Sequence, residues 1–290
     1  MITEFKFTDE SDIRLDNYLK LQFKHLSRTK IQKLILNGKI KVDDFIVKPS
    51  FVLKPNQIIT YDEKPDIKEN NNYLIPEKMN IEILFEDEDI IAVNKTAGLV
   101  VHPGAGNKRG TLLNGLMHRY KNDLSSIDKS RPGVVHRLDK FTSGIILFAK
   151  TDFSHYSLSN QFAERKIKKK YNALVWGKIS EGGHMNNMIT RDPNNRLKYK
   201  VSNNNKGKVS LTDYTINKSY NLPITLLDIF PHTGRTHQIR VHLSNIGHPI
   251  LNDSLYGGSS DKLKSFDSKY KSRFLKIFKK IKRVALHAQE

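Results

Sequence analysis

The chain is organised around one stretch, HRLDKFTSG, which runs from His136 to Gly144. It places one carboxylate, Asp139, among three side chains that carry or can carry positive charge, and the apolar run IILFA follows at once. A short β-branched run next to glycine is typical of a buried strand, so Asp139 is expected on the loop that enters it. Neighbouring positive charge favours an ionised aspartate, which suits a nucleophile or a base. The alternative is an ion pair that only stabilises the junction of loop and strand.

Composition indicates a polyanionic partner. The 290 residues include 49 Lys and Arg against 30 Asp and Glu, a formal net charge of +19. A surplus of this size predicts binding to nucleic acid or to an anionic membrane surface. A membrane is disfavoured because no apolar run approaches the roughly 20 residues that span a bilayer, and the first residues lack the apolar core of a signal peptide. The absence of cysteine excludes disulfides and thiolate metal sites and is compatible with the cytoplasm.

The length and a change in composition predict two domains. Residues 63–78 are rich in Asn, Lys and Glu, with two prolines and few apolar side chains, which is typical of a linker. We therefore predict a small module at 11–62 and a larger domain at 79–290.

The small module is expected to be α+β. Apolar residues at helical spacing within 12–23 predict one helix, and Ser27 as a cap with Gly38 as a stop predicts a second. Residues 39–47 alternate around an Asp-Asp turn and predict a hairpin of two short strands.

In the larger domain, apolar runs of strand length occur at 81–85, 90–93, 171–177 and 224–230. Candidate N-caps of helices are Thr111, either Thr151 or Asp152, and Thr233. The polar stretch 186–207 predicts a long loop or a hairpin. Residues 262–283 combine many basic side chains with apolar ones, which predicts an amphipathic helix whose basic face suits RNA or a membrane surface.

Two further patterns are rejected as sites. The glycines between Gly98 and Gly110 match neither Gly-x-Gly-x-x-Gly nor a P-loop, so no nucleotide cofactor is expected. The histidines at 237, 242 and 248 have spacings of 5 and 6, which do not place them on one helix face. We predict structural histidines there and no metal.

Several segments resemble the RluA-type RNA pseudouridine synthases: HRLDK followed by TSG, VNK at 93–95, GLVVHPGAG at 98–106, GTLLN at 110–114 and GRTHQIRVH at 234–242. The HPGAG variant is most similar to the RluD branch, which modifies large-subunit ribosomal RNA. The resemblance implies the pseudouridine synthase fold, a mixed and mainly antiparallel β-sheet with flanking helices. It also implies that the enzyme needs no cofactor.

The resemblance implies roles for single residues. Asp139 is the expected catalytic aspartate, acting on the sugar carbon or as a base on the sugar, and Tyr171 is expected to stack on the target base. We expect Arg240 to pair with Asp139 and hold it ionised, with Arg235 as the second choice.

Two more residues are expected to meet the substrate. A base inside RNA must be flipped out before a carboxylate can reach its sugar. By the same resemblance, Arg137 takes the place of the flipped base. Ile239 is expected to line the floor of the pocket, although a plain core role is equally consistent with its apolar side chain.

The segments SRTKIQKLI at 27–35 and NGKIKV at 37–42 resemble the S4 RNA-binding domain. The resemblance implies that Arg28, Lys30 and Lys33 lie against RNA phosphates. The alternative is a solvated helix face whose cations contact nothing.

The leading hypothesis is therefore a monomeric, cytoplasmic synthase acting on ribosomal RNA. A second hypothesis is a non-catalytic RNA-binding protein with a decayed synthase domain. This hypothesis is based on the last residue given, Glu290. Relatives continue from there into a further strand and tail. An ending at this point is expected to expose a sheet edge. A third, a glycosylase, lacks a second carboxylate to serve as the acid.

Overall fold

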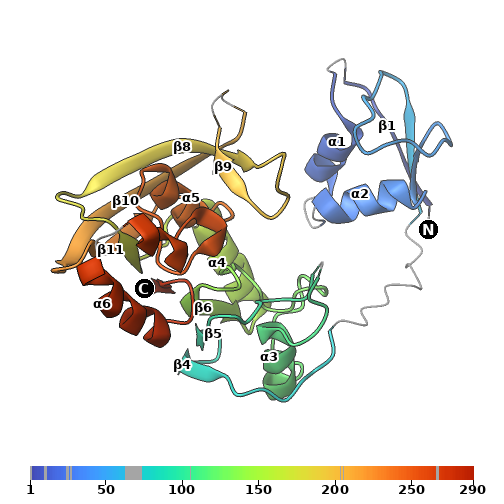
Figure 1. Cartoon of the computed structure of the whole chain (residues 1–290). Coiled ribbons are helices and arrows are strands. Elements are labelled where there is room, and N and C mark those ends of the chain that lie inside the picture. The colour runs from blue at the N-terminus through green and yellow to red at the C-terminus, as the bar shows by residue number, and fades with distance from the viewer. Residues whose placement is uncertain are drawn as a thin grey trace. The chain divides into compact units, whose positions relative to one another are not determined.

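A computed structural model describes most of the chain, namely residues 2–9, 12–23, 26, 28–62, 74–104, 106–202, 204, 206–265 and 268–290. The residues form two compact units, unit 1 (Met1–Asn70) and unit 2 (Asn71–Glu290), and each is described by itself (Figure 1). The predicted cap at Ser27 and residues 63–73 of the predicted linker lie outside the described residues.

Unit 1 is a small α+β module. In chain order it contains β1 (Ile2–Lys6), α1 (Leu15–Gln22), α2 (Arg28–Leu36), β2 (Ile40–Val42) and β3 (Ile58–Asp62). β3 lies between β1 and β2 and pairs antiparallel with both. The helices pack their apolar faces on the sheet, and the buried core includes Leu15, Leu19, Ile31, Ile35, Ile40 and Ile59.

The predicted hairpin of unit 1 forms only in part. Asp43 and Asp44 have φ of 49° and 65°, the backbone of a type I′ turn, and the residues on either side exchange both backbone hydrogen bonds. The strand predicted at 45–47 is wrong: the pairing stops at a single bridge between Val42 and Phe45, on the edge of β2 that does not pair with β3. The chain instead turns towards α1, where the carbonyls of Pro49 and Phe51 accept hydrogen bonds from the first N–H groups of the helix.

Unit 2 is built on one large sheet. Its strands are β4 (Glu82–Glu86), β5 (Ile90–Lys95), β6 (Ser143–Ala149), β7 (Tyr171–Trp176), β8 (Gly183–Arg191), β9 (Tyr199–Val201), β10 (Lys208–Ser219), β11 (Ile224–Pro231) and β12 (Leu286–Ala288). Their order across the sheet is β4-β5-β6-β12-β7-β11-β10-β8-β9. β12 runs parallel to β6 and every other neighbouring pair is antiparallel, which confirms the predicted mixed, mainly antiparallel sheet.

Helices flank this sheet on both faces. The described α-helices of unit 2 are α3 (Leu112–Tyr120), α4 (Asp152–Ala163), α5 (Gln238–Asn245) and α6 (Ser268–Lys280). On β7, Ala173 packs with Ile239 of α5, whereas Trp176 packs with Phe274 of α6. Alternate residues of a strand point to opposite faces, so α5 and α6 cover the two sides of this part of the sheet.

Two of the three predicted threonine caps are confirmed. Thr111 and Thr151 each accept a hydrogen bond from the backbone N–H three residues on, at the start of α3 and α4. Thr233 is wrong as a cap, because α5 begins only at Gln238. The Thr233 hydroxyl is used elsewhere: it donates to Gln238 Oε1 at 2.7 Å and accepts from the N–H of Leu211 at 2.9 Å.

The last strand does not form an edge of the sheet. β12 lies between β6 and β7, and the strands at the two edges of the described sheet are β4 and β9. The polar stretch at 186–207 contains the end of β8 and all of β9, so the hairpin alternative holds there.

The basic segment near the end of the chain folds as a 3-10 helix (Ser260–Ser265) followed by α6. Phe274 of α6 is fully buried against Trp176 while Leu275 is exposed, as expected for an amphipathic helix. None of the helices in the described ranges is long and apolar enough to cross a membrane.

Candidate active site

Strand pairing in unit 2 brings distant parts of the chain to one cavity. Ala288 of β12 pairs with Gly144 of β6 on one side and with Tyr171 of β7 on the other. The loop before β6, the start of β7 and the loop before α5 therefore surround a cavity of about 430 Å³. All six residues predicted for the site of this domain line it: Arg137, Asp139, Tyr171, Arg235, Ile239 and Arg240.

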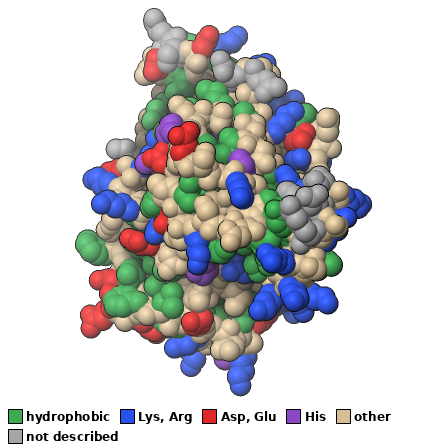
Figure 2. Space-filling model, turned by 60° about the vertical axis from the view of Figure 1, so that its left-hand side comes forward, with side chains coloured by type: hydrophobic (Ala, Val, Ile, Leu, Met, Phe, Trp, Pro, Cys, Tyr) green, Lys and Arg blue, Asp and Glu red, His purple; other side chains and the backbone are tan. Residues whose placement is uncertain are grey.

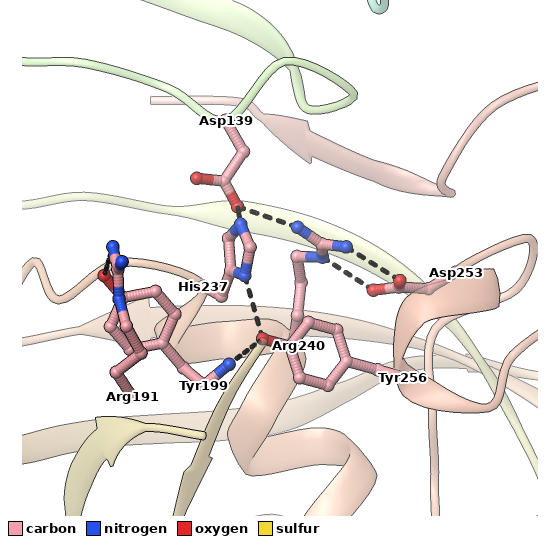
Figure 3. A network of polar contacts seen from close by, with 7 residues as sticks. All are labelled: Asp139, Arg191, Tyr199, His237, Arg240, Asp253 and Tyr256. Carbon is pink, nitrogen blue, oxygen red and sulfur yellow. Dashed lines mark hydrogen bonds and ion pairs between the residues drawn. The ribbon is translucent and has the colours of Figure 1, made fainter. Parts of the chain in front are cut away.

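The side chain of Asp139 is half-buried at this cavity, with 20% of its surface exposed. Its Oδ2 accepts a hydrogen bond from Arg240 Nη1 at 3.2 Å and has His237 Nε2 at 3.8 Å (Figure 3). No hydrogen bond reaches Oδ1 from the residues that the structure describes. One carboxylate oxygen is therefore held and the other is open.

Arg240 is itself fixed by a second aspartate that sequence analysis missed. Its Nε and Nη2 donate to the two oxygens of Asp253 at 2.7 and 2.8 Å, which leaves Nη1 for Asp139. Burial disfavours the charge on Arg240, but the hydrogen bonds and the negative charges of Asp253 and Asp139 together outweigh it and raise the pKa of the guanidinium. A lone aspartate on a loop carries no sequence pattern, so only the fold could reveal it.

His237 is hydrogen-bonded within the protein, as predicted for a structural histidine, and it also lines the cavity. Its Nδ1 lies 2.8 Å from the hydroxyl oxygen of Tyr256, and that oxygen also accepts the backbone N–H of Tyr199 at 2.9 Å. Arg191 completes the network by donating to the Tyr199 hydroxyl at 3.2 Å (Figure 3). A test for metal-ligand spacing has no means of detecting a single histidine of this kind.

The two other histidines of this region contact the protein framework. His242 Nδ1 lies 3.0 Å from the hydroxyl of Thr212, and His248 Nδ1 lies 2.8 Å from the carbonyl of Trp176. Within the described part of the chain, no three His, Asp or Glu side chains are grouped as metal ligands.

Tyr171 begins β7 and presents its ring to the same cavity as Asp139. Burial, and after it the charge of Asp139, raises the pKa of the Tyr171 hydroxyl to about 12. The phenol is therefore protonated at neutral pH and can donate a hydrogen bond.

A buried lysine supports the loop that carries Asp139. Lys95 Nζ donates to the carbonyls of Leu99, Thr96 and Lys140 at 2.9, 3.0 and 3.2 Å. Burial lowers the pKa of Lys95 to about 8, and the charge of Asp139 opposes this shift. Lys95 thus links the segment after β5, at Thr96 and Leu99, to the loop that carries Asp139, at Lys140.

His136 is neutral rather than one of the cations around Asp139. Its Nε2 accepts the backbone N–H of Leu147 at 2.8 Å and its ring stacks on Phe162 with 4.5 Å between centroids. Burial, and after it the charge of Lys169, lowers the pKa of His136 to about 4. This histidine fixes the loop to β6.

The remaining predicted residues of unit 2 have different settings. Arg137 is exposed at the cavity, and Arg235 is half-buried with its Nε donating to the carbonyl of Val209 at 3.3 Å. Ile239 is buried and packs in the core with Leu243 while also lining the cavity, so both of its expected roles are compatible with its position.

In unit 1 the three predicted RNA-binding cations all lie on α2, but Arg28 is engaged within the protein. Its Nε and Nη2 donate to Asp16 Oδ2 at 3.1 and 2.8 Å. Lys33 is exposed and Lys30 half-buried. Over the face of the molecule in Figure 2, Lys and Arg side chains recur in groups separated by polar surface.

Unit 2 has the features of an enzyme: its mainly antiparallel sheet carries a cavity lined by a carboxylate that is bound to an arginine. A small α+β module, unit 1, accompanies it. The chain belongs to the RNA pseudouridylate synthase family. The family described as "RNA pseudouridylate synthase" matches residues 89–245, and the S4 domain matches residues 13–59. The protein is therefore an RNA pseudouridine synthase with an S4 domain.

Relatives agree over most of the chain. An uncharacterized RNA pseudouridine synthase of Aquifex aeolicus is 43% identical, covering 89% of this chain and 81% of the relative. The ribosomal large subunit pseudouridine synthase D of Buchnera aphidicola subsp. Acyrthosiphon pisum is 41% identical, covering 95% and 84%. The solved structure of human RNA pseudouridylate synthase domain containing 1 has a TM-score of 0.54 at 26% identity, covering 72% of this chain and 76% of that one.

Proposed function

We propose that this synthase isomerises specific uridines of large-subunit ribosomal RNA to pseudouridine, with Asp139 as its catalytic aspartate. Relatives named ribosomal large subunit pseudouridine synthase D support this choice of RNA. The reaction takes place in the cytoplasm, and one chain carries a complete site.

The observation that carries the proposal is the asymmetry of Asp139. Arg240 binds one oxygen of the carboxylate, and the other oxygen is open to the cavity. A charge-assisted hydrogen bond from the guanidinium fixes the direction of the carboxylate. A free carboxylate oxygen suits both attack on the sugar carbon and removal of a proton from the sugar.

The chemistry asks for little else. Pseudouridine formation detaches uracil from its ribose, rotates the base and rejoins it through carbon, with no net redox change. Uracil can carry charge on its own carbonyls when it leaves, so one carboxylate suffices where glycosidases commonly use two. The neutral Tyr171 phenol provides a face on which the base can stack and a proton donor beside it.

Access to the uridine requires base flipping, which costs a few kcal/mol of unstacking. The exposed guanidinium of Arg137 at the cavity suits the space that the flipped base leaves behind. Arg235, which also lines the cavity, is assigned to the phosphate backbone of the same nucleotide. In unit 1, Arg28, Lys30 and Lys33 are assigned to phosphates farther along the RNA.

Mapping of pseudouridines in ribosomal RNA tests this proposal. Three strains are compared: one with the gene, one without it, and one without it that carries the Asp139→Asn form. We expect one or more sites in large-subunit RNA to disappear with the gene and to stay absent in the strain with the Asp139→Asn form. If no ribosomal site depends on the gene, the substrate is wrong; if the Asp139→Asn form restores the sites, the catalytic assignment is wrong.

A further inference from the structure

His237 has a backbone conformation that is uncommon for residues other than glycine. It stands at the N-cap position of α5 with φ of 58° and ψ of 16°, in the left-handed region, and its side chain makes no capping hydrogen bond. Histidine adopts this region more often than most side chains, as asparagine and aspartate do, and the conformation still costs of order 1 kcal/mol or more. The strain leaves the imidazole free of the helix and directs it into the cavity.

The contacts of His237 favour the neutral ring that carries its hydrogen on Nε2, because the carboxylate of Asp139 lies on that side and the Tyr256 hydroxyl on the other. The Tyr256 hydroxyl oxygen accepts the backbone N–H of Tyr199, so its single hydrogen is available for His237 Nδ1 at 2.8 Å. A neutral imidazole that accepts at Nδ1 carries its hydrogen on Nε2. Nε2 is the atom that faces Asp139 Oδ2 at 3.8 Å.

Burial favours the neutral form of the His237 imidazole. Burial lowers the pKa of His237, and the charge of Asp139 only partly opposes the shift. The Nε2–H group is therefore an oriented dipole directed at the carboxylate rather than a second full charge. The 3.8 Å between Nε2 and Oδ2 is longer than a hydrogen bond. The Nε2–H group therefore attracts Oδ2 without bonding to it here, and a movement of Asp139 by less than about 1 Å would form the hydrogen bond.

We propose that His237 is a positioning residue for Asp139. With Arg240 it occupies the Oδ2 side of the carboxylate, so that Oδ1 stays directed at the ribose. The inference rests on the proposed catalytic role of Asp139. It adds that the hydrogen bonds from Tyr199 to Tyr256 and from Tyr256 to His237 hold the imidazole in place beside that carboxylate. Glycine would occupy this left-handed position with less strain, and the side chain present instead lines the cavity with its Nε2 beside Asp139.

Two substitutions separate positioning from mere structure. In His237→Asn the amide can still bond to Tyr256 and the residue tolerates the left-handed backbone, but nothing reaches Asp139. In His237→Gln the longer amide can place an N–H near Asp139, although the backbone remains strained. A structural role predicts that Asn is the better replacement, whereas positioning predicts that Gln is.

Steady-state turnover on an RNA substrate tests the ranking. We expect kcat of the His237→Asn form to fall about 10- to 100-fold with KM unchanged, as for a misdirected reacting group. The His237→Gln form should keep kcat within about fivefold of wild type, and its Tm should lie at or below that of the His237→Asn form. The exposed histidine of α3 gives a matched control, His118→Asn, with unchanged turnover.

The outcomes keep the two proposals apart. Wild-type kcat in the His237→Asn form, with Asp139→Asn inactive in the same assay, overturns the role of His237 and leaves the function intact. Full activity of Asp139→Asn overturns the proposed function itself. A His237→Gln form as slow as the His237→Asn form also overturns the positioning role.

Discussion

The tripeptide Arg-Leu-Asp occurs twice in this chain, at 14–16 in unit 1 and at 137–139 in unit 2, and the two aspartates have opposite settings. Asp16 is completely buried and accepts hydrogen bonds from Arg14, Arg28 and Gln32. Asp139 is partly exposed and accepts one hydrogen bond, from Arg240. The leucine between is buried in both copies.

The difference teaches what separates a structural ion pair from a reactive carboxylate. Around Asp16 both oxygens are engaged, and although burial raises its pKa, the hydrogen bonds from Arg28, Gln32 and Arg14 outweigh this and lower the pKa to about 2. Around Asp139 the described nitrogen groups, of Arg240 and His237, approach Oδ2. An aspartate with both oxygens engaged stabilises the fold, whereas one with an open oxygen can meet a substrate.

The largest effect on turnover is expected from Asp139→Asn. The change removes the charge and almost no volume, so kcat should fall by about 1,000-fold or more while RNA affinity stays within a few-fold. Product formation and binding are measured on the same transcript. Asp16→Asn, the matched change in the other copy of the tripeptide, should leave kcat unchanged. An active Asp139→Asn enzyme would remove the distinction between the two aspartates.

Arg240→Lys is expected to come next. A lysine ammonium is a point charge and does not bridge Asp253 and Asp139 as the planar guanidinium does. We expect kcat to fall about 10- to 100-fold with KM for RNA nearly constant. Arg235→Lys is the matched control. If kcat falls more in Arg235→Lys than in Arg240→Lys, Arg235 and not Arg240 is the arginine that pairs with Asp139 during the reaction.

Replacing Arg28, Lys30 and Lys33 together by Ala should act on binding and not on saturated turnover; because Arg28 also donates to the buried Asp16, the form with only Lys30→Ala and Lys33→Ala is measured beside it to separate lost phosphate contacts from a destabilised unit 1. Three lost phosphate contacts lower the slope of log K against log salt by about 2 to 3. We expect kcat/KM to fall, because the lost contacts bind the RNA equally in the ground state and in the transition state. An unchanged salt slope would mean that α2 presents a solvated face. A fall in kcat with intact binding would mean that unit 1 orients the RNA.

Asp16→Asn should have the smallest effect on turnover and a clear effect on stability. We expect unit 1 to lose about 2 kcal/mol of unfolding free energy at pH 7, because the ionised form is favoured in the folded state. Denaturant unfolding measures it. The exposed Asp12 offers a control, since Asp12→Asn should change stability by less than about 0.5 kcal/mol.

The same variant has a defined pH dependence. The folded pKa of Asp16 is depressed from 3.8 to about 2, so its stabilisation is present above pH 3.8 and is lost as the pH falls towards 2. The difference in unfolding free energy between wild type and Asp16→Asn should therefore shrink over this range. A difference that stays constant down to pH 2 would show that packing, and not charge, distinguishes the two forms.

Local sequence determined much of this protein. The caps Thr111 and Thr151, the turn at Asp43 and the strand after HRLDKFTSG depend on hydrogen bonds and side-chain periods within a few residues, and such features can be predicted without the fold. The long motifs also sufficed to indicate the family, which the comparisons confirm.

Local rules failed where a neighbour distant in sequence competes. Thr233 satisfies the pattern of a cap, yet its hydroxyl binds Gln238 and the N–H of Leu211 on another strand. After the Asp-Asp turn the chain leaves β2 beyond Phe45, and the carbonyls of Pro49 and Phe51 accept the first N–H groups of α1. In both cases a contact with another element decided the structure.

The site itself was decided by tertiary structure. Asp139 and Arg240 are 101 positions apart, and they meet because β12 joins β6 to β7 and α5 packs on the same sheet. Asp253, Tyr256 and the orientation of His237 follow from that packing and leave no periodic signal. The two Arg-Leu-Asp copies give the physical reason: the sequence supplies the same charges in both, and only the surrounding donors decide whether a carboxylate oxygen remains open.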